Sequence, residues 1–379
     1  MIATEPEAAI DDGQTGEAIL EPDRPIVDAH HHLWFQPEER LRALEGSDVE
    51  LVRKLAPIYR RHARYLFDEF LAETDSGHNI VASVFVDAKL MYRADGREEL
   101  RPIGEVEFVN GLAAMSASGN FGPARLCAGI VGHADLTLGD RAEAVLEALV
   151  QAGGARLKGV RCPVLHDDDP QLTQRGLSNR GVMIEPAFRN GFALLDRYGL
   201  SFDAYVFEPQ LGELAALANR FEHIPIVLNH VGGPVGVAGY RGRREERFPA
   251  WLAAMGDLAC CPNVSVKLGG LGMPQCGFDI VAPAGEPHSA ALARRWRPYV
   301  KTCIELFGAE RCMFESNYPV DSYSCSYPTL WNAFKRIAAT ASEAEKDALF
   351  RSTAARIYRL DLNPGAKRIP GEGERDTVH

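Results

Sequence analysis

Short apolar runs rich in β-branched residues recur along the chain, and each has the composition of a buried strand. They cover residues 26–29, 80–88, 126–135, 157–164, 200–206, 224–231, 264–271 and 312–320. Most of them are separated by longer stretches in which apolar residues return every three or four positions, the period of an amphipathic helix. These stretches cover residues 49–71, 104–117, 141–152, 186–198, 209–220, 248–259 and 290–307, and the pair 327–339 and 342–358 follows the last strand.

The alternation of strands and helices predicts an α/β fold with a parallel sheet. Eight repeats in one domain-sized chain favour a closed (β/α)8 TIM barrel over an open doubly wound sheet. Neither GxGxxG after the first strand nor GxxxxGK[ST] occurs, which disfavours an open nucleotide-binding sheet. We therefore expect a single barrel domain over residues 25–362, a flexible polar arm at 1–24 and a flexible tail at 363–379.

Composition and charge narrow the expected class of protein. The chain has 379 residues, 46% of them hydrophobic, which is enough for a large globular core. Its formal net charge of -11 argues against nucleic acid or an anionic membrane as a partner. The eight scattered cysteines form no CxxC pair, and no signal peptide or membrane-spanning run is recognisable. We expect a cytoplasmic protein, for which a homo-oligomer is compatible with the sequence.

Two histidines at the end of the first strand are the leading candidates for chemistry. His30 and His32 lie two positions apart, so the period of a strand aims both to the same side, with Asp28 one step deeper. Neutral imidazole is a common ligand of divalent metals. In a barrel of this kind the active site forms where the strands end, and polar residues also end the other strands: Asp87, Lys89, His133, Asp135, Arg161, Asp203, Tyr205, His230, Lys267, Glu315, Asn317 and Asp321.

Seven short motifs, in chain order, resemble those of the amidohydrolase superfamily: VDAHHHLW, MYR, GIVGHADL, KGVR, LNHVGGP, VSVKLGGL and RCMFESNYPVD. More narrowly, they resemble its amidohydrolase-2 branch of lactonase-like TIM-barrel hydrolases. That branch includes 2-pyrone-4,6-dicarboxylate lactonase, sugar lactonases and 4-sulfomuconolactone hydrolases. The resemblance covers about residues 25–362 and implies hydrolysis of a lactone or a related cyclic ester.

The resemblance also implies roles for particular residues. His30, His32 and His230 match histidines that hold one divalent ion, commonly zinc or manganese, in metal-using members. In members that work without a metal, such histidines polarise the carbonyl directly. Arg161 matches a substrate-contacting arginine, so we expect a small anionic substrate whose carboxylate is bound by Arg161 together with Arg93. Tyr92, His133 and Lys267 are further candidates for binding substrate, although His133 and Lys267 could equally serve the structure alone.

Two positions depart from the usual pattern of the superfamily. Asn317 stands where the eighth strand usually ends in an Asp that binds metal and activates water, and an amide cannot act as a base. We therefore assign Asn317 an orienting role as a fourth ligand. Either Glu315 or Asp321 acts as the base, or a metal-bound hydroxide attacks without such a base. The fifth strand supplies no histidine, so we expect a single-metal or metal-free site.

Two other functions remain open at this point. The same barrel could act as a metal-dependent decarboxylase or another lyase, since the loss of the eighth-strand Asp weakens the case for water activation. A barrel that has lost catalysis and binds a ligand is the second, and the retained histidines and Arg161 argue against it.

Overall fold

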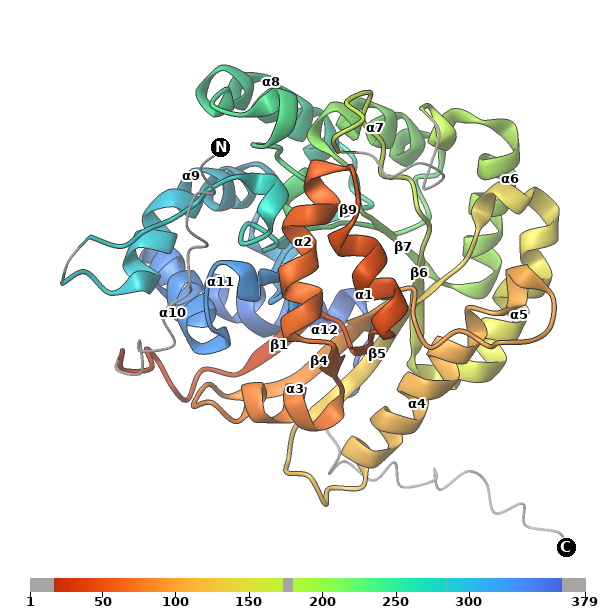
Figure 1. The fold of residues 1–379 in the computed structure, drawn as a ribbon, viewed down its shortest axis with the longest axis horizontal. Helices are drawn as coiled ribbons and strands as arrows, with labels where there is room; N and C mark the ends of the chain where they lie inside the picture. The colour runs from red at the N-terminus through yellow and green to blue at the C-terminus, as the bar shows by residue number, and fades with distance from the viewer. Residues whose placement is uncertain (1–16, 173–179, 284, 363–379) are drawn as a thin grey trace, which may run out of the picture.

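The computed structural model describes residues 17–172, 180–283 and 285–362 and shows an eight-stranded parallel barrel surrounded by helices (Figure 1). The strands pair in chain order: β1 (Ile26–His31), β4 (Ile80–Val86), β5 (Arg125–His133), β6 (Leu157–Arg161), β7 (Ser201–Ala204), β8 (Ile226–Leu228), β9 (Val264–Leu268) and β10 (Cys312–Phe314). The ring closes just beyond β10, where His32 N donates to Tyr318 O at 2.8 Å and Asn317 N donates to His30 O at 2.8 Å. The predicted TIM barrel is confirmed.

The helices fill the connections between the strands, as the apolar periodicity predicted. They are α4 (Ile103–Ala117), α5 (Ala142–Gly153), α6 (Pro186–Tyr198), α7 (Leu211–Arg220), α8 (Arg244–Ala259), α9 (His288–Phe307), α10 (Tyr327–Ile337), α11 (Glu343–Asp347) and α12 (Thr353–Ile357). Their apolar faces pack on the outside of the strands and form the main core. A second apolar cluster fills the lower interior of the barrel, and Tyr358, at the end of α12, belongs to it.

The first connection differs from the single helix expected over residues 49–71. It contains α1 (Glu38–Glu45), α2 (Glu50–Arg61) and α3 (Phe67–Thr74), with a two-stranded ribbon of β2 (Trp34–Phe35) and β3 (Arg64–Tyr65). Long-range hydrogen bonds explain the break, because Trp34 Nε1 donates to His62 O at 2.7 Å and Gln36 N donates to Ala63 O at 2.6 Å. These bonds use the backbone oxygens of His62 and Ala63, which a continuous helix would need for its own hydrogen bonds.

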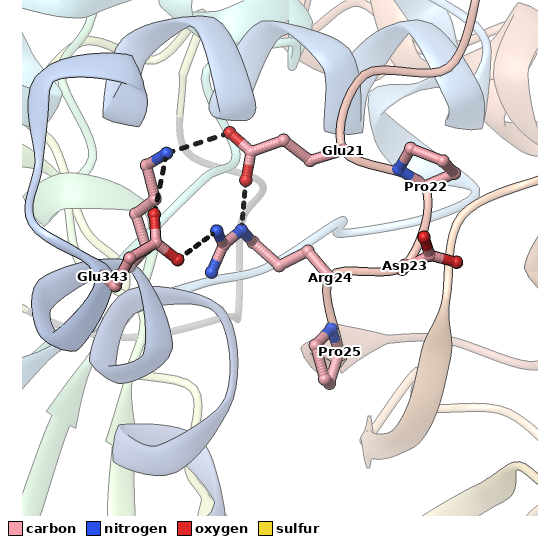
Figure 2. Close-up of a pocket in the computed structure, with 7 residues that line it drawn as sticks. Glu21, Pro22, Asp23, Arg24, Pro25 and Glu343 are labelled. Atoms are coloured by element: carbon pink, nitrogen blue, oxygen red, sulfur yellow. Dashed lines mark hydrogen bonds and ion pairs between the residues drawn. The ribbon is translucent and has the colours of Figure 1, made fainter.

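Residues 17–24, expected as part of a flexible arm, are bound to α10 and α11. Figure 2 shows how Glu21 accepts from Arg24 and from Lys346 Nζ (3.0 Å), while Arg24 Nη2 donates to Glu343 at 2.8 Å. Below this surface network, Lys335 Nζ donates to the backbone oxygens of Leu20 (2.7 Å) and Glu21 (2.9 Å). The rest of the expected arm, residues 1–16, and the expected tail, residues 363–379, lie outside the described residues.

Among the helices in the described part of the chain, none is long and apolar enough to cross a membrane.

Lys335 ties the N-terminal segment to the barrel, so its removal should weaken the fold. Its side chain is only 2% exposed and also lies 2.8 Å from His78 Nδ1. Lys335→Met keeps most of the volume but leaves two buried carbonyls without their donor, and we expect the free energy of unfolding to fall by about 2–3 kcal/mol. Lys301→Met is the matched control, since Lys301 Nζ contacts only Thr340 Oγ1 at the surface. Equal urea midpoints for the two variants would contradict this assignment.

Candidate active site

The side chains predicted to carry the chemistry meet at the C-terminal ends of the strands. His30 lies near the end of β1, His32 just beyond it and His230 just after β8. The ring centroid of His30 is 4.8 Å from that of His32 and 4.8 Å from that of His230. The structure therefore brings together the three histidines that the sequence singled out.

A bulge in β1 makes this placement possible. Its pairing with β4 shifts register between Asp28 and His31, so the strict alternation assumed from the sequence breaks there. Asp28 accepts the backbone N–H groups of His30 (3.3 Å) and Ser316 (2.9 Å), and its other oxygen accepts Tyr327 OH from α10 (3.1 Å). Asp28 thus fixes the bulge and does not lie beneath His30 in the site.

His31, between the two site histidines, has a structural role. Its ring stacks on Phe70 of α3 with centroids 3.8 Å apart, and its Nε2 lies 2.9 Å from Ser83 Oγ. The side chain therefore faces the helices, while His30 and His32 face the barrel mouth.

The protonation pattern of His32 and His230 follows from their partners. His32 Nδ1 lies 2.8 Å from the backbone oxygen of Val86, and His230 Nδ1 lies 2.8 Å from Glu315 Oε1. A carbonyl and a carboxylate can only accept, so both Nδ1 atoms carry the proton and both Nε2 atoms present a lone pair. Metal-binding histidines usually donate their other ring N–H to an acceptor of this kind.

The proton of His30 can lie on Nδ1 or on Nε2, because one neighbour of Nδ1 is a hydrogen-bond acceptor and the other is a donor. Glu315 Oε2 lies 2.9 Å away and requires an N–H, whereas Lys267 Nζ lies 3.3 Å away and requires a lone pair. With the proton on Nε2, His30 can donate to His32 Nε2 at 3.2 Å. With the proton on Nδ1, two lone pairs face each other at that distance, an arrangement that a bound cation would stabilise.

The residues present fit a divalent ion. The 3.2 Å between the two Nε2 atoms is close to the roughly 3.3 Å expected between nitrogens that bind one tetrahedral zinc ion at about 2.0–2.1 Å. His30, His230 and Glu315 also offer ligand atoms within 4.8 Å of one another. Glu315 Oε1 already accepts both the backbone N–H (3.1 Å) and Nδ1 of His230, so we read Glu315 as the group that orients the imidazoles.

Burial keeps the imidazoles neutral. It lowers the pKa of His30 well below its ordinary value, with a further lowering by the charge of Lys267. Burial, together with the charge of Arg161, lowers the pKa of His32 to about 3. Neutral imidazole is the form that binds a metal or accepts a proton, so these two side chains are ready for either role at neutral pH.

Lys267, a candidate either for binding substrate or for a purely structural role, has Asp203 as its main partner. Lys267 Nζ donates to Asp203 Oδ1 at 2.7 Å, and both side chains are fully buried. Asp203 Oδ1 also accepts Tyr358 OH at 2.8 Å. Lys267 therefore lies against His30 as well as Asp203, and its contact with substrate stays a prediction.

Arg161 lies at the mouth, but its charge is already matched. It donates from Nε to the Asp87 carboxylate and from Nη2 to the Asp87 backbone oxygen. Burial raises the pKa of Asp87, but the charges of Arg161 and His133 outweigh burial, and the pKa is lowered overall. Asp87 Oδ2, His133 Nδ1 and Tyr92 OH are buried without a hydrogen-bond partner among the described residues.

Arg93 does not belong to this group. Its guanidinium pairs with Glu107 of α4, and 43% of its side chain is exposed. The sequence placed it beside Tyr92 in the loop after β4, but the start of α4 turns it to the outer surface. The expected carboxylate clamp of Arg161 with Arg93 is therefore not formed.

The last two predicted residues, Asn317 and Asp321, form a pair. Asn317 Nδ2 donates to Asp321 Oδ1 at 2.8 Å, and Asp321 Oδ2 accepts the backbone N–H of Gly272 at 3.1 Å. Burial raises the pKa of Asp321 to about 8, which makes it a poor proton acceptor at neutral pH.

Sequence reasoning missed Tyr358 and Glu105. Tyr358 reaches Asp203 from the end of α12, far along the chain, and no local pattern marks it. Glu105 of α4 is fully buried and accepts the N–H groups of Ala88 (3.1 Å) and Leu90 (3.0 Å), which holds the loop that follows Asp87. An acidic residue on the apolar side of a helix was the only available signal.

Comparison with known proteins agrees with this architecture. The model of the amidohydrolase family matches residues 27–360. An L-fucono-1,5-lactonase of Burkholderia ambifaria is 34% identical over 348 residues, which cover 89% of this chain and 97% of that protein. The uncharacterized protein y4mH of Sinorhizobium fredii is 31% identical over 345 residues, covering 89% of this chain and 99% of that protein. A zinc-bound amidohydrolase from Burkholderia multivorans superposes with a TM-score of 0.67 at 26% identity, covering 89% of this chain and all of that one. The chain belongs to the amidohydrolase family.

Proposed function

We propose that the protein is a lactonase that hydrolyses the ring ester of a small-molecule lactone. The observation that carries the proposal is the set of three imidazoles at the barrel mouth, of which His32 and His230 are each fixed at Nδ1 by an acceptor. Such a set can polarise an ester carbonyl and activate water. The lactonase named among the relatives, at 34% identity, supports the same reaction.

The polar groups around Arg161 support a hydroxylated substrate in preference to the carboxylated one expected from the sequence. Arg161 is neutralised by Asp87, so a substrate carboxylate would find no net charge on this pair. Asp87 Oδ2, His133 Nδ1 and Tyr92 OH are instead buried groups that make no hydrogen bond within the described residues, and the first two lie 3.8 Å apart. Hydroxyl groups both donate and accept, and they suit such a mixed set. We therefore propose a sugar-type lactone.

His30, His32 and His230 would hold a divalent ion such as zinc or manganese, with the amide oxygen of Asn317 as a further ligand. When bound, such an ion supplies a Lewis acid for the ester carbonyl and lowers the pKa of water. Glu315 keeps the ligand nitrogen of His230 directed at the site by accepting its Nδ1–H, and its second oxygen lies 2.9 Å from His30 Nδ1.

Without an ion, His230 has the arrangement of a general base. Its Nδ1–H is held by Glu315 Oε1 at 2.8 Å, and its Nε2 is free to accept a proton from the attacking water. Glu315 would stabilise the resulting imidazolium, as the carboxylate does in a catalytic triad. Of the two carboxylates proposed as the base, Glu315 therefore acts through His230, and Asp321 stands behind Asn317.

A second function, decarboxylation on the same site, is favoured by one observation. Asn317 occupies the position usually held by a water-activating Asp, and a decarboxylase needs no such base. The products separate the two reactions, since a lactonase releases a hydroxy acid and a decarboxylase releases carbon dioxide.

The reaction is tested by following acid release at constant pH with two lactones. We expect ring opening of L-fucono-1,5-lactone, with kcat/KM at least about tenfold above that for 2-pyrone-4,6-dicarboxylate, because buried polar groups left unpaired penalise the wrong substrate. If the histidines hold an ion, dialysis against a chelator lowers the rate by about 100-fold or more, and zinc or manganese restores it. Release of carbon dioxide from an aromatic carboxylate, with no ring opening of either lactone, would contradict the proposal.

The histidines are tested by His30→Ala and His230→Ala. We expect each variant to lower kcat by about 100- to 10,000-fold, because each removes a carbonyl-polarising or proton-accepting nitrogen. His223→Ala is the matched control, since His223 lies on the surface with 63% of its side chain exposed. Thermal unfolding followed by circular dichroism checks that the variants fold. Near-normal turnover in both site variants would refute the assignment.

A further inference from the structure

Asn317 has a tightly fixed backbone, which leaves the rotation of its side-chain amide as its main freedom. Its φ of 52° lies in the left-handed region, which Asn tolerates better than most residues. Its backbone N–H donates to His30 O at 2.8 Å, and its carbonyl accepts the N–H groups of Val320 (2.9 Å) and Asp321 (3.2 Å). Asn317 is thus held beside His30, and only its amide can still turn.

Asp321 determines which way that amide turns. The Asn317 amide donates from Nδ2 to Asp321 Oδ1, 2.8 Å away, so its oxygen lies on the other side. Asp321 is itself held, because its second oxygen accepts Gly272 N–H at 3.1 Å. Gly272 leaves the space for this contact, since a Cβ there would lie only 2.9 Å from Asp321 Oδ2.

We propose that Asp321 is a positioning residue that directs the amide oxygen of Asn317 toward the three histidines. The amide oxygen then serves as the ligand or water-orienting acceptor that the eighth strand contributes. In this arrangement the carboxylate stands behind the amide instead of at the rim. This inference rests on the proposed hydrolytic function for its kinetic consequence, but the orientation itself can be observed without catalysis.

Exchange of the two side chains gives a sharp test. In Asp321→Asn, one amide oxygen must serve both the Asn317 amide and Gly272 N–H, so the Asn317 amide loses its fixed direction. In Asn317→Asp, two carboxyl groups face each other across about 2.8 Å, and the amide donor between them is lost. In the double variant N317D/D321N, the amide at position 321 donates to the carboxylate at 317 while its oxygen accepts Gly272 N–H, so both hydrogen bonds are kept.

For Asp321→Asn we expect kcat to fall about 10- to 100-fold with little change in KM, because misplacing one group at the reacting centre has effects of this size. The double variant should recover most of the loss. Asp347→Asn is the matched control for the same chemical change, because Asp347 pairs only with Arg351 on the surface of α11. Equal losses in Asp321→Asn and the double variant would overturn the proposal, since a merely structural Asp321 predicts no rescue.

A readout independent of activity comes from nuclear magnetic resonance of protein labelled with ¹⁵N at asparagine side chains. The Asn317 amide signal is identified by its loss in Asn317→Asp. We expect slow solvent exchange of its protons in the native chain, and a changed shift with faster exchange in Asp321→Asn. An unchanged signal overturns the positioning role whatever the kinetics show. A changed signal in a protein that opens no lactone leaves the positioning role standing and refutes the proposed reaction instead.

If Asp321→Asn does not fold, the double variant decides. Slow exchange at its position-321 amide supports the hydrogen-bonded pair, and fast exchange overturns it.

Discussion

The contact of Glu315 with two imidazoles is the interaction on which the site depends. A fully buried carboxylate is costly unless it is paired or hydrogen-bonded, and Glu315 obtains its donors from the backbone N–H and Nδ1 of His230 and lies 2.9 Å from His30 Nδ1. The hydrogen bond to His230 Nδ1 directs the remaining nitrogen of that ring at the barrel mouth, beside His30. The stability of the buried charge and the orientation of the reactive groups therefore have one cause.

A second buried pair beneath His30 completes the charge balance. Lys267 and Asp203 are both fully buried, and Tyr358 OH adds a hydrogen bond to the carboxylate. Tyr358 comes from α12, which follows the last strand and seals the lower end of the barrel with apolar side chains. Tyr358 thus holds Asp203 by a hydrogen bond, and Asp203 pairs with Lys267. Lys267 Nζ in turn lies 3.3 Å from His30 Nδ1. Closure of the fold and placement of the site are linked in this way.

Structural features that depend on a local sequence pattern could be predicted. Features that depend on a residue distant along the chain could not. Short apolar runs rich in β-branched residues predicted the eight strands, and their polar ends predicted that His30, His32 and His230 meet. The single helix expected at 49–71 was wrong because contacts with β2 interrupt it. The roles of Lys267 and Arg93 could not be predicted, since Asp203 and Glu107 capture them through contacts that only the folded chain brings together.

The pairing of the cationic side chains with carboxylates of the chain itself affects which substrates the site is expected to prefer. Arg161, Lys267 and Arg93 are the cations that the sequence offered for an anionic substrate, and each is paired with a carboxylate of the chain itself. An acidic protein that neutralises the cations of its own site has little electrostatic attraction for an anion. Recognition must then come from directed hydrogen bonds to buried groups such as Asp87 and Tyr92, which reject a ligand that leaves them unpaired. Under the proposed function, selectivity in this barrel is expected to follow from the hydroxyl pattern of the lactone more than from its charge.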